Sequence, residues 1–199
     1  MAKKPSTKNR IITAAWQLFR EKGYDETTIE DIISLSETSK GTFYHYFSGK
    51  DSLLSSLSDL FDSYYEELLP QLDSAMNTVD KLVTLCCKAH RMIGDSIQPE
   101  LLASLYSSQV VTKGDKHLLN QNRFYYHMIY QLADEGIRRG DIRSDLSVRE
   151  IARIFAMCER AIVYDYCISG AAYDLGDYTA QMIPLLLEGI RAPGKKTTP

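Results

Sequence analysis

Apolar residues recur at a spacing of three and four along most of the chain, which is the pattern of amphipathic helices. Residues 7–22 give a clear example, with Ser6 as a candidate N-cap and Gly23 as the stop. The apolar stripe of this segment consists of Ile11, Ala15, Leu18 and Phe19. We therefore predict a first helix over residues 7–22.

Two short helices are expected after the first. Thr27 followed by Glu30 is a capping-box pattern, and it opens a helix of about two turns in which several isoleucines share one face. A polar stretch then leads to residues 39–47, where Phe43 and Phe47 lie one turn apart and anchor a third short helix.

A longer helix is predicted to follow. Ser48 with Asp51 is a second capping-box pattern, and apolar residues continue at helical spacing until Pro70. Beyond it the same spacing predicts five more helices, and a third capping box, Ser147 with Glu150, opens the penultimate one. These five helices are expected over residues 79–93, 100–110, 116–139, 148–169 and 175–191.

The pattern of a β-sheet is missing from the sequence. No two-residue alternation is bounded by hairpin turns, and no internal repeat of solenoid period occurs. The predicted fold class is all-α, with an N-terminal module of three short helices joined by a long helix to a C-terminal helical bundle.

The last two helices are apolar on two sides. Such a helix is either buried centrally or shared between its own core and a partner subunit. Two of them at the end of the chain favour a homodimer formed by four-helix packing. Pro184 deletes one backbone hydrogen bond and is a candidate kink in the last helix. The predicted interface residues are Ile151, Phe155, Cys158, Ile162, Met182 and Leu186.

Composition places the chain among ordinary globular proteins. With 199 residues, 44% of them hydrophobic and 25% charged, it has room for a small domain beside a larger one. No apolar run has the length of a membrane span, and MAKKPSTKNR carries no apolar signal-peptide core, so a cytoplasmic location is expected. The four cysteines form no paired C-x-x-C spacing, which favours reduced thiols in a core.

Basic charge is concentrated at the start of a chain whose formal net charge is -3. Residues 1–50 carry eight lysines and arginines against six acidic residues, whereas the remainder carries fifteen against twenty. The first ten residues hold four cations and no acid, which suits contact with phosphates. A charged tail that is merely solvated would have the same composition, so this signal alone is weak.

Three short helices, the third with an exposed polar face, are the arrangement of a helix-turn-helix. Lys40 and Thr42 have side chains that reach base edges, and Gly41 lets the helix backbone approach DNA closely. Tyr44 and His45 suit phosphate oxygens. A short polar-faced helix also occurs in bundles that bind no DNA, so this face leaves both interpretations open.

A longer pattern of small, aromatic, glycine and lysine positions covers residues 8–54. It consists of Ala14-Ala15-x-x-Leu18-Phe19-x-x-x-Gly23-Tyr24-x-x-Thr27-Thr28-Ile29-x-x-Ile32 and then Ser39-Lys40-Gly41-Thr42-Phe43-Tyr44-His45-Tyr46-Phe47-x-x-Lys50-x-x-Leu53-Leu54. This pattern closely resembles the N-terminal module of tetracycline-repressor (TetR) family transcriptional regulators, which are homodimeric helix-turn-helix proteins. The rest of the chain is similar to the family only in length, helical content and its last two helices.

The resemblance implies a helix-turn-helix DNA-binding domain over residues 1–52 and a helical ligand-binding and dimerisation domain over residues 53–199. Thr27 or Thr28, at the start of the second helix, would hold a phosphate at the positive end of the helix dipole. By the same resemblance, the residues that face bases would be Ser39, Lys40, Gly41 and Thr42. Those that contact the DNA backbone would be Tyr44, His45 and Lys50, with a merely solvated position as the alternative for each.

One position departs from the family pattern. The turn between the second and third helices usually carries Ala-Gly-Val, whereas this chain has Ser36-Glu37-Thr38. A residue other than glycine in a left-handed turn costs about 1 kcal/mol. Glu37 also brings a negative charge near DNA, which is expected to weaken nonspecific binding.

The resemblance further implies that the C-terminal domain binds a small molecule that changes the separation of the two DNA-binding heads. Thirteen tyrosines suggest an aromatic or amphipathic ligand, which is a hypothesis. Each candidate is a polar or aromatic residue on an otherwise apolar helix, and for each a core or surface position is the alternative. The candidates are His90, Tyr106, Tyr125, Tyr126, Tyr130, Arg160 and Tyr164.

Cys86 and His90 are four residues apart on one predicted helix, a spacing that can chelate a metal. Two ligands are too few for a closed site, and the sequence does not place His127 or Cys158 beside them. A core position for both residues is therefore favoured, and neither a metal nor a cofactor is predicted.

Other function classes find little support. The chain has no G-x-S-x-G, no H-E-x-x-H and no glycine-rich phosphate loop, so an enzyme is not expected. The prediction is a DNA-binding regulator, more commonly a repressor released from its operator by a ligand. The alternative is an adaptor of the same fold that recruits a protein partner and senses no metabolite. Sequence does not separate repression from activation or name the operator.

Overall fold

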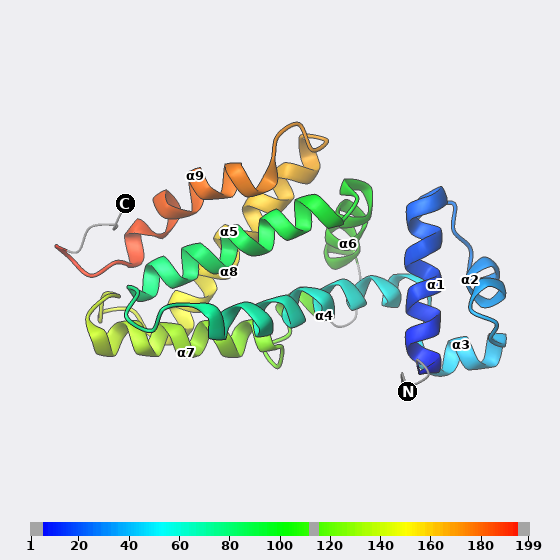
Figure 1. The fold of residues 1–199 in the computed structure, drawn as a ribbon, viewed down its shortest axis with the longest axis horizontal. Helices are drawn as coiled ribbons and strands as arrows, with labels where there is room; N and C mark the ends of the chain where they lie inside the picture. The colour runs from blue at the N-terminus through cyan, green and yellow to red at the C-terminus, as the bar shows by residue number, and fades with distance from the viewer. Residues whose placement is uncertain (1–5, 112–115, 195–199) are drawn as a thin grey trace. The chain divides into compact units, whose positions relative to one another are not determined.

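The computed structural model describes residues 6–111 and 116–194, and Figure 1 shows that these residues are helical apart from their connections. No strand occurs in these ranges, where an isolated β-bridge pairs Ile142 with Arg191. The prediction of an all-α fold is confirmed. No helix in the described part of the chain combines the length and apolarity needed to cross a membrane. Lys3 and Lys4 of the predicted basic segment lie outside the described residues.

The helix boundaries follow local capping signals. The α-helices are α1 Thr7–Lys22, α2 Ile29–Leu35, α3 Lys40–Tyr46, α4 Lys50–Leu68, α5 Thr78–Ser96, α6 Pro99–Val111, α7 Phe124–Arg139, α8 Val148–Ile168 and α9 Leu175–Leu187. Short 3-10 turns are η1 Leu69–Gln71, η2 His117–Leu119 and η3 Glu188–Ile190. Helix α1 has the predicted bounds, with the Ser6 side chain accepting from the Asn9 amide at its start and Gly23 at its end.

The chain divides into two compact units. Unit 1 comprises the residues up to Leu60 together with Gln98–Leu118, and unit 2 comprises Phe61–Ile97 and the residues from Leu119 onward. The predicted boundary after residue 52 therefore falls inside α4, which begins in unit 1 and ends in unit 2. Helix α6 belongs to unit 1, although it follows α5 in sequence.

The core of unit 1 is built from one apolar side of each short helix. Ile11 and Phe19 of α1, Ile32 of α2 and Phe43 of α3 are all at most 2% exposed. Leu57 of α4 is fully buried as well. Burial of large side chains is worth about 1.5–3 kcal/mol each, so this small core holds the three helices in a fixed arrangement.

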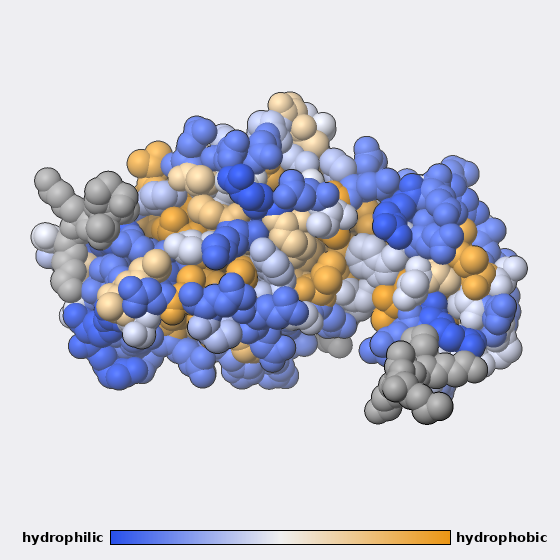
Figure 2. All heavy atoms as spheres, viewed as in Figure 1, coloured by the Kyte–Doolittle hydropathy of each residue, from blue (hydrophilic) through white to orange (hydrophobic). Residues whose placement is uncertain are grey.

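Unit 2 is organised around α5, which packs against α9 and α7, while α8 packs against α7 and α9 (Figure 1). Glycine permits the close approach of α5 and α9. A Cβ atom on Gly176 of α9 would lie 2.9 Å from the Cβ atom of Arg91, and one on Gly94 of α5 would lie 3.4 Å from that of Leu175. At Gly176 the two helices are therefore closer than a larger residue would allow, whereas a Cβ atom on Gly94 would make an ordinary van der Waals contact. Hydrophobic residues also reach the surface of unit 2, among hydrophilic ones (Figure 2).

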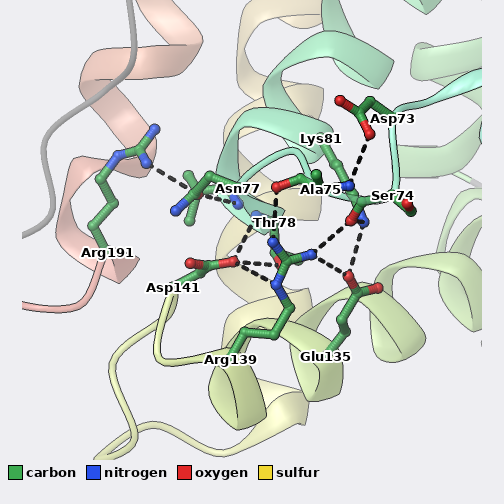
Figure 3. A network of polar contacts seen from close by, with 11 residues as sticks. Asp73, Ser74, Ala75, Asn77, Thr78, Lys81, Glu135, Arg139, Asp141 and Arg191 are labelled. Carbon is green, nitrogen blue, oxygen red and sulfur yellow. Dashed lines mark hydrogen bonds and ion pairs between the residues drawn. The ribbon is translucent and has the colours of Figure 1, made fainter.

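A polar network closes one end of unit 2 (Figure 3). The Asp141 carboxylate accepts hydrogen bonds of 3.1 Å from both the amide and the hydroxyl of Thr78, at the start of α5. Arg139 pairs with Asp141 at 3.3 Å and donates to the Ser74 carbonyl at 2.9 Å. Arg191 donates to the Asn77 side chain at 3.2 Å. The network thus joins the end of α7 and the C-terminal segment to the start of α5.

Three sequence expectations were wrong at helix ends. The helix predicted over residues 116–139 is interrupted, because Asn120 accepts from the Asn122 amide and turns the chain before α7 begins. The helix predicted over residues 175–191 ends at Leu187 and continues as η3. The capping box of Ser48 with Asp51 does not form: α4 begins at Lys50, and the Asp51 carboxylate accepts from the Tyr24 hydroxyl.

Candidate DNA interface and ligand site

The start of α2 is capped one residue later than the sequence pattern suggested. Thr28 forms the capping box with Asp31, and its side chain accepts from the Asp31 amide. Thr27 is 1% exposed, and its hydroxyl donates to the Gly23 carbonyl at 2.7 Å. The capping box predicted for Thr27 with Glu30 is therefore wrong, and Thr27 has no free surface for the predicted phosphate contact. Hydrogen bonds from Lys22 and Thr28 lower the pKa of the half-buried Asp31 carboxyl.

The turn between α2 and α3 contains the expected left-handed residue. Glu37 has a φ of 51°, the conformation that glycine adopts without strain. The Arg10 guanidinium of α1 donates to the Glu37 carbonyl at 3.0 Å, and the Thr38 amide donates to the Ile33 carbonyl at 3.1 Å. These contacts hold the turn, so the glutamate is accommodated and α3 keeps a defined direction.

Helix α3 presents a polar face. Ser39 is the N-cap, accepting from the Thr42 amide at 3.1 Å, and Lys40 forms an exposed ion pair with Glu30 of α2 at 3.1 Å. That pair with Glu30 raises the pKa of Lys40. Tyr44 is 47% exposed, whereas Phe43 on the opposite side is fully buried. The face has the side chains and the exposure that contact with a DNA groove requires.

Gly41 leaves the backbone of α3 uncovered. A Cβ atom at this position would meet only the Ser39 hydroxyl oxygen, at 3.9 Å. The fold of unit 1 therefore does not need glycine here for reasons of packing. His45 and Tyr46 next to this surface are exposed as well.

Lys50 is engaged within unit 1. Its ammonium group donates to the carbonyl oxygens of Tyr24 at 2.7 Å and Asp25 at 3.1 Å, and it lies 4.3 Å from the centre of the Tyr24 ring. These contacts fix the segment between α1 and α2 to the start of α4. The predicted DNA-backbone contact of Lys50 would have to be shared with this structural role.

Unit 2 contains a pocket of about 750 Å³ between α7, α8 and the segment that precedes α7. Its polar lining combines three arginines, two tyrosines and one glutamine: Arg149, Arg153, Arg160, Tyr126, Tyr130 and Gln121. Its apolar lining consists of Leu119, Ala152, Ala156 and Met157. The Arg160 guanidinium donates to the Tyr126 hydroxyl at 3.3 Å. No acidic side chain occurs among the described residues of this lining.

A second polar group of side chains is buried between α5, α8 and their neighbours. His90 of α5 is fully buried, and its Nε2 atom lies 3.5 Å from an oxygen of Glu159 of α8. The hydroxyls of Tyr65 and Tyr125 each donate to one Glu159 oxygen. Burial by itself raises the pKa of Glu159, but the hydrogen bonds from His90 and both tyrosines outweigh it, so that pKa is lowered. Burial raises the pKa of the neighbouring Cys86 thiol.

Comparison with known proteins identifies the N-terminal part of unit 1. Residues 11–57, which include most of α1, all of α2 and α3 and the start of α4, match the family described as bacterial regulatory proteins, tetR family. This part of the chain belongs to the TetR family. The resemblance seen in the sequence is thereby confirmed, and the polar face of α3 lies in the helix-turn-helix of a TetR-family transcriptional regulator.

Relatives match this TetR-family chain over nearly its whole length. It is 26% identical over 204 residues to the HTH-type transcriptional repressor KstR2 of Rhodococcus jostii strain RHA1, covering 96% of this chain and 94% of that protein. It is 23% identical over 184 residues to the fatty acid metabolism regulator protein of Bacillus subtilis strain 168, covering 91% and 94%. FadR of Thermus thermophilus, solved in complex with lauroyl-CoA, has the same fold, with a TM-score of 0.73, 23% identity and coverage of 96% and 100%.

The predicted ligand residues of this TetR-family chain fall in separate places. Tyr126, Tyr130 and Arg160 line the pocket, whereas His90 and Tyr125 belong to the buried group around Glu159. Tyr164 is 52% exposed on α8, and Tyr106 lies on α6 in unit 1. Arg149, Arg153 and Glu159 were not predicted from the sequence. A charged residue on an otherwise apolar helix is the pattern that singled out Arg160 in the sequence, and the same pattern applies to these three residues.

Helix α8 of the TetR-family chain has three distinct sides, because each residue turns the helix by about 100°. Ile151, Phe155 and Ile162 face the core and are at most 4% exposed, so these three predicted interface residues have almost no surface for a partner. The pocket residues occupy a second side. The third side is exposed or half-buried and carries Ile154, Cys158, Ala161, Asp165 and Ile168.

Proposed function

We propose that this TetR-family regulator is a homodimeric repressor whose release from its operator is triggered by an acyl-CoA thioester bound in unit 2. The observation that carries the proposal is the pocket with three arginines and no described acidic lining residue. Guanidinium groups bind phosphates in a bidentate way, and a CoA thioester is a phosphate-rich anion. The tyrosine rings and apolar residues of the same lining suit the adenine ring and the start of an acyl chain.

The spacing of the arginines on α8 supports a single anionic ligand. Arg149 and Arg153 are one turn apart, and Arg160 lies two turns further along the same side. Three positive charges that converge on one pocket repel one another, so a bound polyanion would stabilise the arrangement. The pocket volume of about 750 Å³ lies within the ordinary range for small-molecule sites.

The relatives favour the same class of ligand. The Thermus thermophilus FadR structure is a complex with lauroyl-CoA, and the Bacillus subtilis FadR structure, which covers 92% of this chain with a TM-score of 0.70, is a complex with stearoyl-CoA. Both are transcriptional regulators, and the first is described as a repressor.

The proposed dimer uses the third side of α8 and the matching side of α9. Ile168 is 67% exposed on α8, and Leu185 and Leu186 are 70% and 41% exposed on α9. Apolar residues that repeat along two adjacent helices favour four-helix packing between two chains. Leu185→Glu is expected to give a monomer in size-exclusion chromatography with light scattering. Val110→Glu on α6 of unit 1, where the valine is 75% exposed, is the matched control and keeps the dimer.

The decisive experiment measures operator release. A duplex identified by footprinting the DNA upstream of the gene is labelled, bound by the purified protein and titrated with CoA, acyl-CoA thioesters of several chain lengths and free fatty acids. We expect acyl-CoA to lower the fluorescence anisotropy and free fatty acids to leave it unchanged at the same concentration. The ligand proposal fails if no CoA thioester changes operator affinity, and a stable complex with another protein would then favour an adaptor.

Arginine variants separate ligand binding from DNA binding. Arg153→Ala is expected to raise the acyl-CoA concentration needed for release by about ten-fold or more, because one charge-assisted contact to phosphate is worth about 1.5–3 kcal/mol. Operator affinity without ligand is expected to stay unchanged. Arg138→Ala is the matched control, since this exposed arginine pairs with Asp134 within α7 and does not line the pocket. Equal responses of the two variants would contradict the assignment of the pocket.

A further inference from the structure

Three potential metal ligands of different chemistry converge in the buried group of unit 2. Helix α5 supplies Cys86 and His90 one turn apart, and α8 supplies Glu159. All three residues are buried, and their ligand atoms lie within 4.8 Å of one another. The sequence offered only the pair on α5. The third ligand is Glu159, which is distant in the sequence and which no sequence pattern singled out.

The distances between these atoms are close to those around a tetrahedral ion. The Nε2 atom of His90 lies 3.5 Å from the Oε1 atom of Glu159 and 3.9 Å from the Sγ atom of Cys86. Bond lengths of about 2.3 Å to sulfur and 2.0–2.1 Å to nitrogen and oxygen place the ligands of a tetrahedral zinc ion about 3.3–3.6 Å apart. The two His90 distances would need to shorten by only a few tenths of an ångström, and the Cys86 to Glu159 distance, which is within 4.8 Å, by at most about 1.2 Å.

Hydrogen bonds orient the histidine as a metal ligand. Thr179 donates its only hydroxyl proton to the Leu175 carbonyl at 2.7 Å, so its oxygen accepts from Nδ1 of His90, also at 2.7 Å. This places a proton on Nδ1 and directs Nε2 toward Cys86 and Glu159. A hydrogen-bonded second nitrogen is the usual support of a histidine that binds metal through the other nitrogen.

The carboxylate is oriented in the same way. The hydroxyls of Tyr65 and Tyr125 donate to the two different oxygens of Glu159. Each carboxylate oxygen has a further lone pair, so these contacts hold Glu159 in place without using its capacity to bind an ion. By contrast, within the described part of the chain the polar contacts of the Cys86 sulfur are long, at 3.9 Å and 4.0 Å to the His90 ring nitrogens.

The charges in this buried site select the class of ion. Once an ion has displaced the proton of Cys86 and any proton on Nε2 of His90, a thiolate and a carboxylate together carry two negative charges, which are costly in a dry interior unless they are compensated. A divalent cation neutralises them, and the neutral imidazole adds no charge. We propose that Cys86, His90 and Glu159 form a binding site for a divalent cation of the zinc class, with a fourth position that a water molecule can take.

Binding in this scheme exchanges protons for the metal. The ion replaces the proton of the Cys86 thiol and any proton on Nε2 of His90, and these protons leave to solvent. No electron transfer is involved. The ion would join α5 to α8 and leave α9 attached through the His90 to Thr179 hydrogen bond. This inference does not depend on the acyl-CoA proposal, because the pocket and the cluster share no lining residue.

Cobalt provides a spectroscopic test on the full-length chain. The purified protein is treated with a chelator and a reductant, exchanged into chelator-free buffer and titrated with Co²⁺. We expect about one ion per chain, tetrahedral visible bands and a near-ultraviolet thiolate-to-cobalt band, all removed by Zn²⁺. A wild-type protein that shows no thiolate-to-cobalt band would overturn the proposal.

Variants identify the ligands. Cys86→Ala is expected to abolish the thiolate band and to weaken Zn²⁺ binding by at least about a hundred-fold, since even outer-shell changes cost 10–100-fold. Cys87→Ala is the matched control, because Cys87 is adjacent in sequence but outside the cluster, and it should keep the band. Glu159→Gln preserves the side-chain shape and is expected to weaken binding by at least about ten-fold. It keeps the proposal testable if Cys86→Ala does not fold. A thiolate band that survives Cys86→Ala, or undiminished affinity in Glu159→Gln, would refute the assignment.

Discussion

Gly41→Ala separates the stability of the helix-turn-helix from its contact with DNA. Gly41 is the second residue of α3, is exposed, and would place a Cβ atom no closer than 3.9 Å to its nearest neighbour, the Ser39 hydroxyl oxygen. Alanine is favoured over glycine by about 0.8–1.0 kcal/mol in a helix interior, and by about half of that in a first turn. The variant should therefore be more stable than the wild type by about 0.5 kcal/mol, which raises the thermal midpoint by about 1–2 °C for a chain of this length.

Operator binding should respond in the opposite direction. The added methyl group lies where the backbone of α3 is expected to approach the DNA, so it pushes the helix away from the groove. The hydrogen bonds between neighbouring residues of α3 and the DNA become longer and weaker as a result. We expect operator affinity to fall by at least ten-fold, or about 1.4 kcal/mol. Fluorescence anisotropy with the labelled operator at fixed salt measures the affinity, and circular dichroism of the same samples measures the thermal midpoint.

The control places the same substitution elsewhere. A Cβ atom on Gly189 would have no neighbour within 4 Å, and this glycine lies in η3 of unit 2, so Gly189→Ala should leave operator affinity unchanged. If Gly41→Ala folded and bound the operator within two-fold of the wild type, the start of α3 would not be a close DNA contact. The assignment of the groove-facing surface would then have to change.

Three further substitutions test the packing and turns that position these surfaces. Glu37→Gly removes a left-handed glutamate with a φ of 51°, so urea unfolding should show a gain of about 1 kcal/mol, and a loss would mean that the turn is unstrained. Thr28→Ala deletes the cap of α2 and should cost about 1 kcal/mol in the same assay, whereas an unchanged midpoint would assign the capping to another group. Gly136→Ala brings a Cβ atom to 2.5 Å from the Cδ1 atom of Ile142 and should lower the free energy of unfolding by about 1–3 kcal/mol. Adding Ile142→Val to this variant removes the Cδ1 atom and should recover part of that loss. No recovery would mean that the clash is with another residue.

The fold was predictable where its signals are local. Ser6 and Gly23 fix both ends of α1 through hydrogen bonds within a few residues, and the capping box of Ser147 with Glu150 opens α8 as expected. The sequence was less decisive where two neighbouring residues could both cap the same helix. Thr27 and Thr28 have equal capping chemistry, and burial of Thr27 in the core of unit 1 decides between them.

The candidate sites depend more on contacts between distant residues. The polar face of α3 follows from a pattern within nine residues, so it could be read from the sequence. Glu159 could not be placed in that way, because its hydrogen-bond partner Tyr65 is 94 residues away and a glutamate on a helix is ordinarily solvated. Three of the predicted interface residues, Ile151, Phe155 and Ile162, lie in the chain's own core for a related reason: periodicity gives the apolar sides of α8 but does not say which side the chain itself covers.

Nearly every side of α8 has a structural or binding role. Its core side packs against α7 and α9 and reaches His90 of α5 through Glu159, its arginine side borders a pocket, and its remaining side exposes apolar residues. A rotation of α8 by even a fraction of the 100° between successive residues would therefore disturb all three surroundings at once. Substitutions should therefore be poorly tolerated along the whole length of α8. A small movement of the helix at one side also shifts the other two sides directly, because all three belong to the same rigid element.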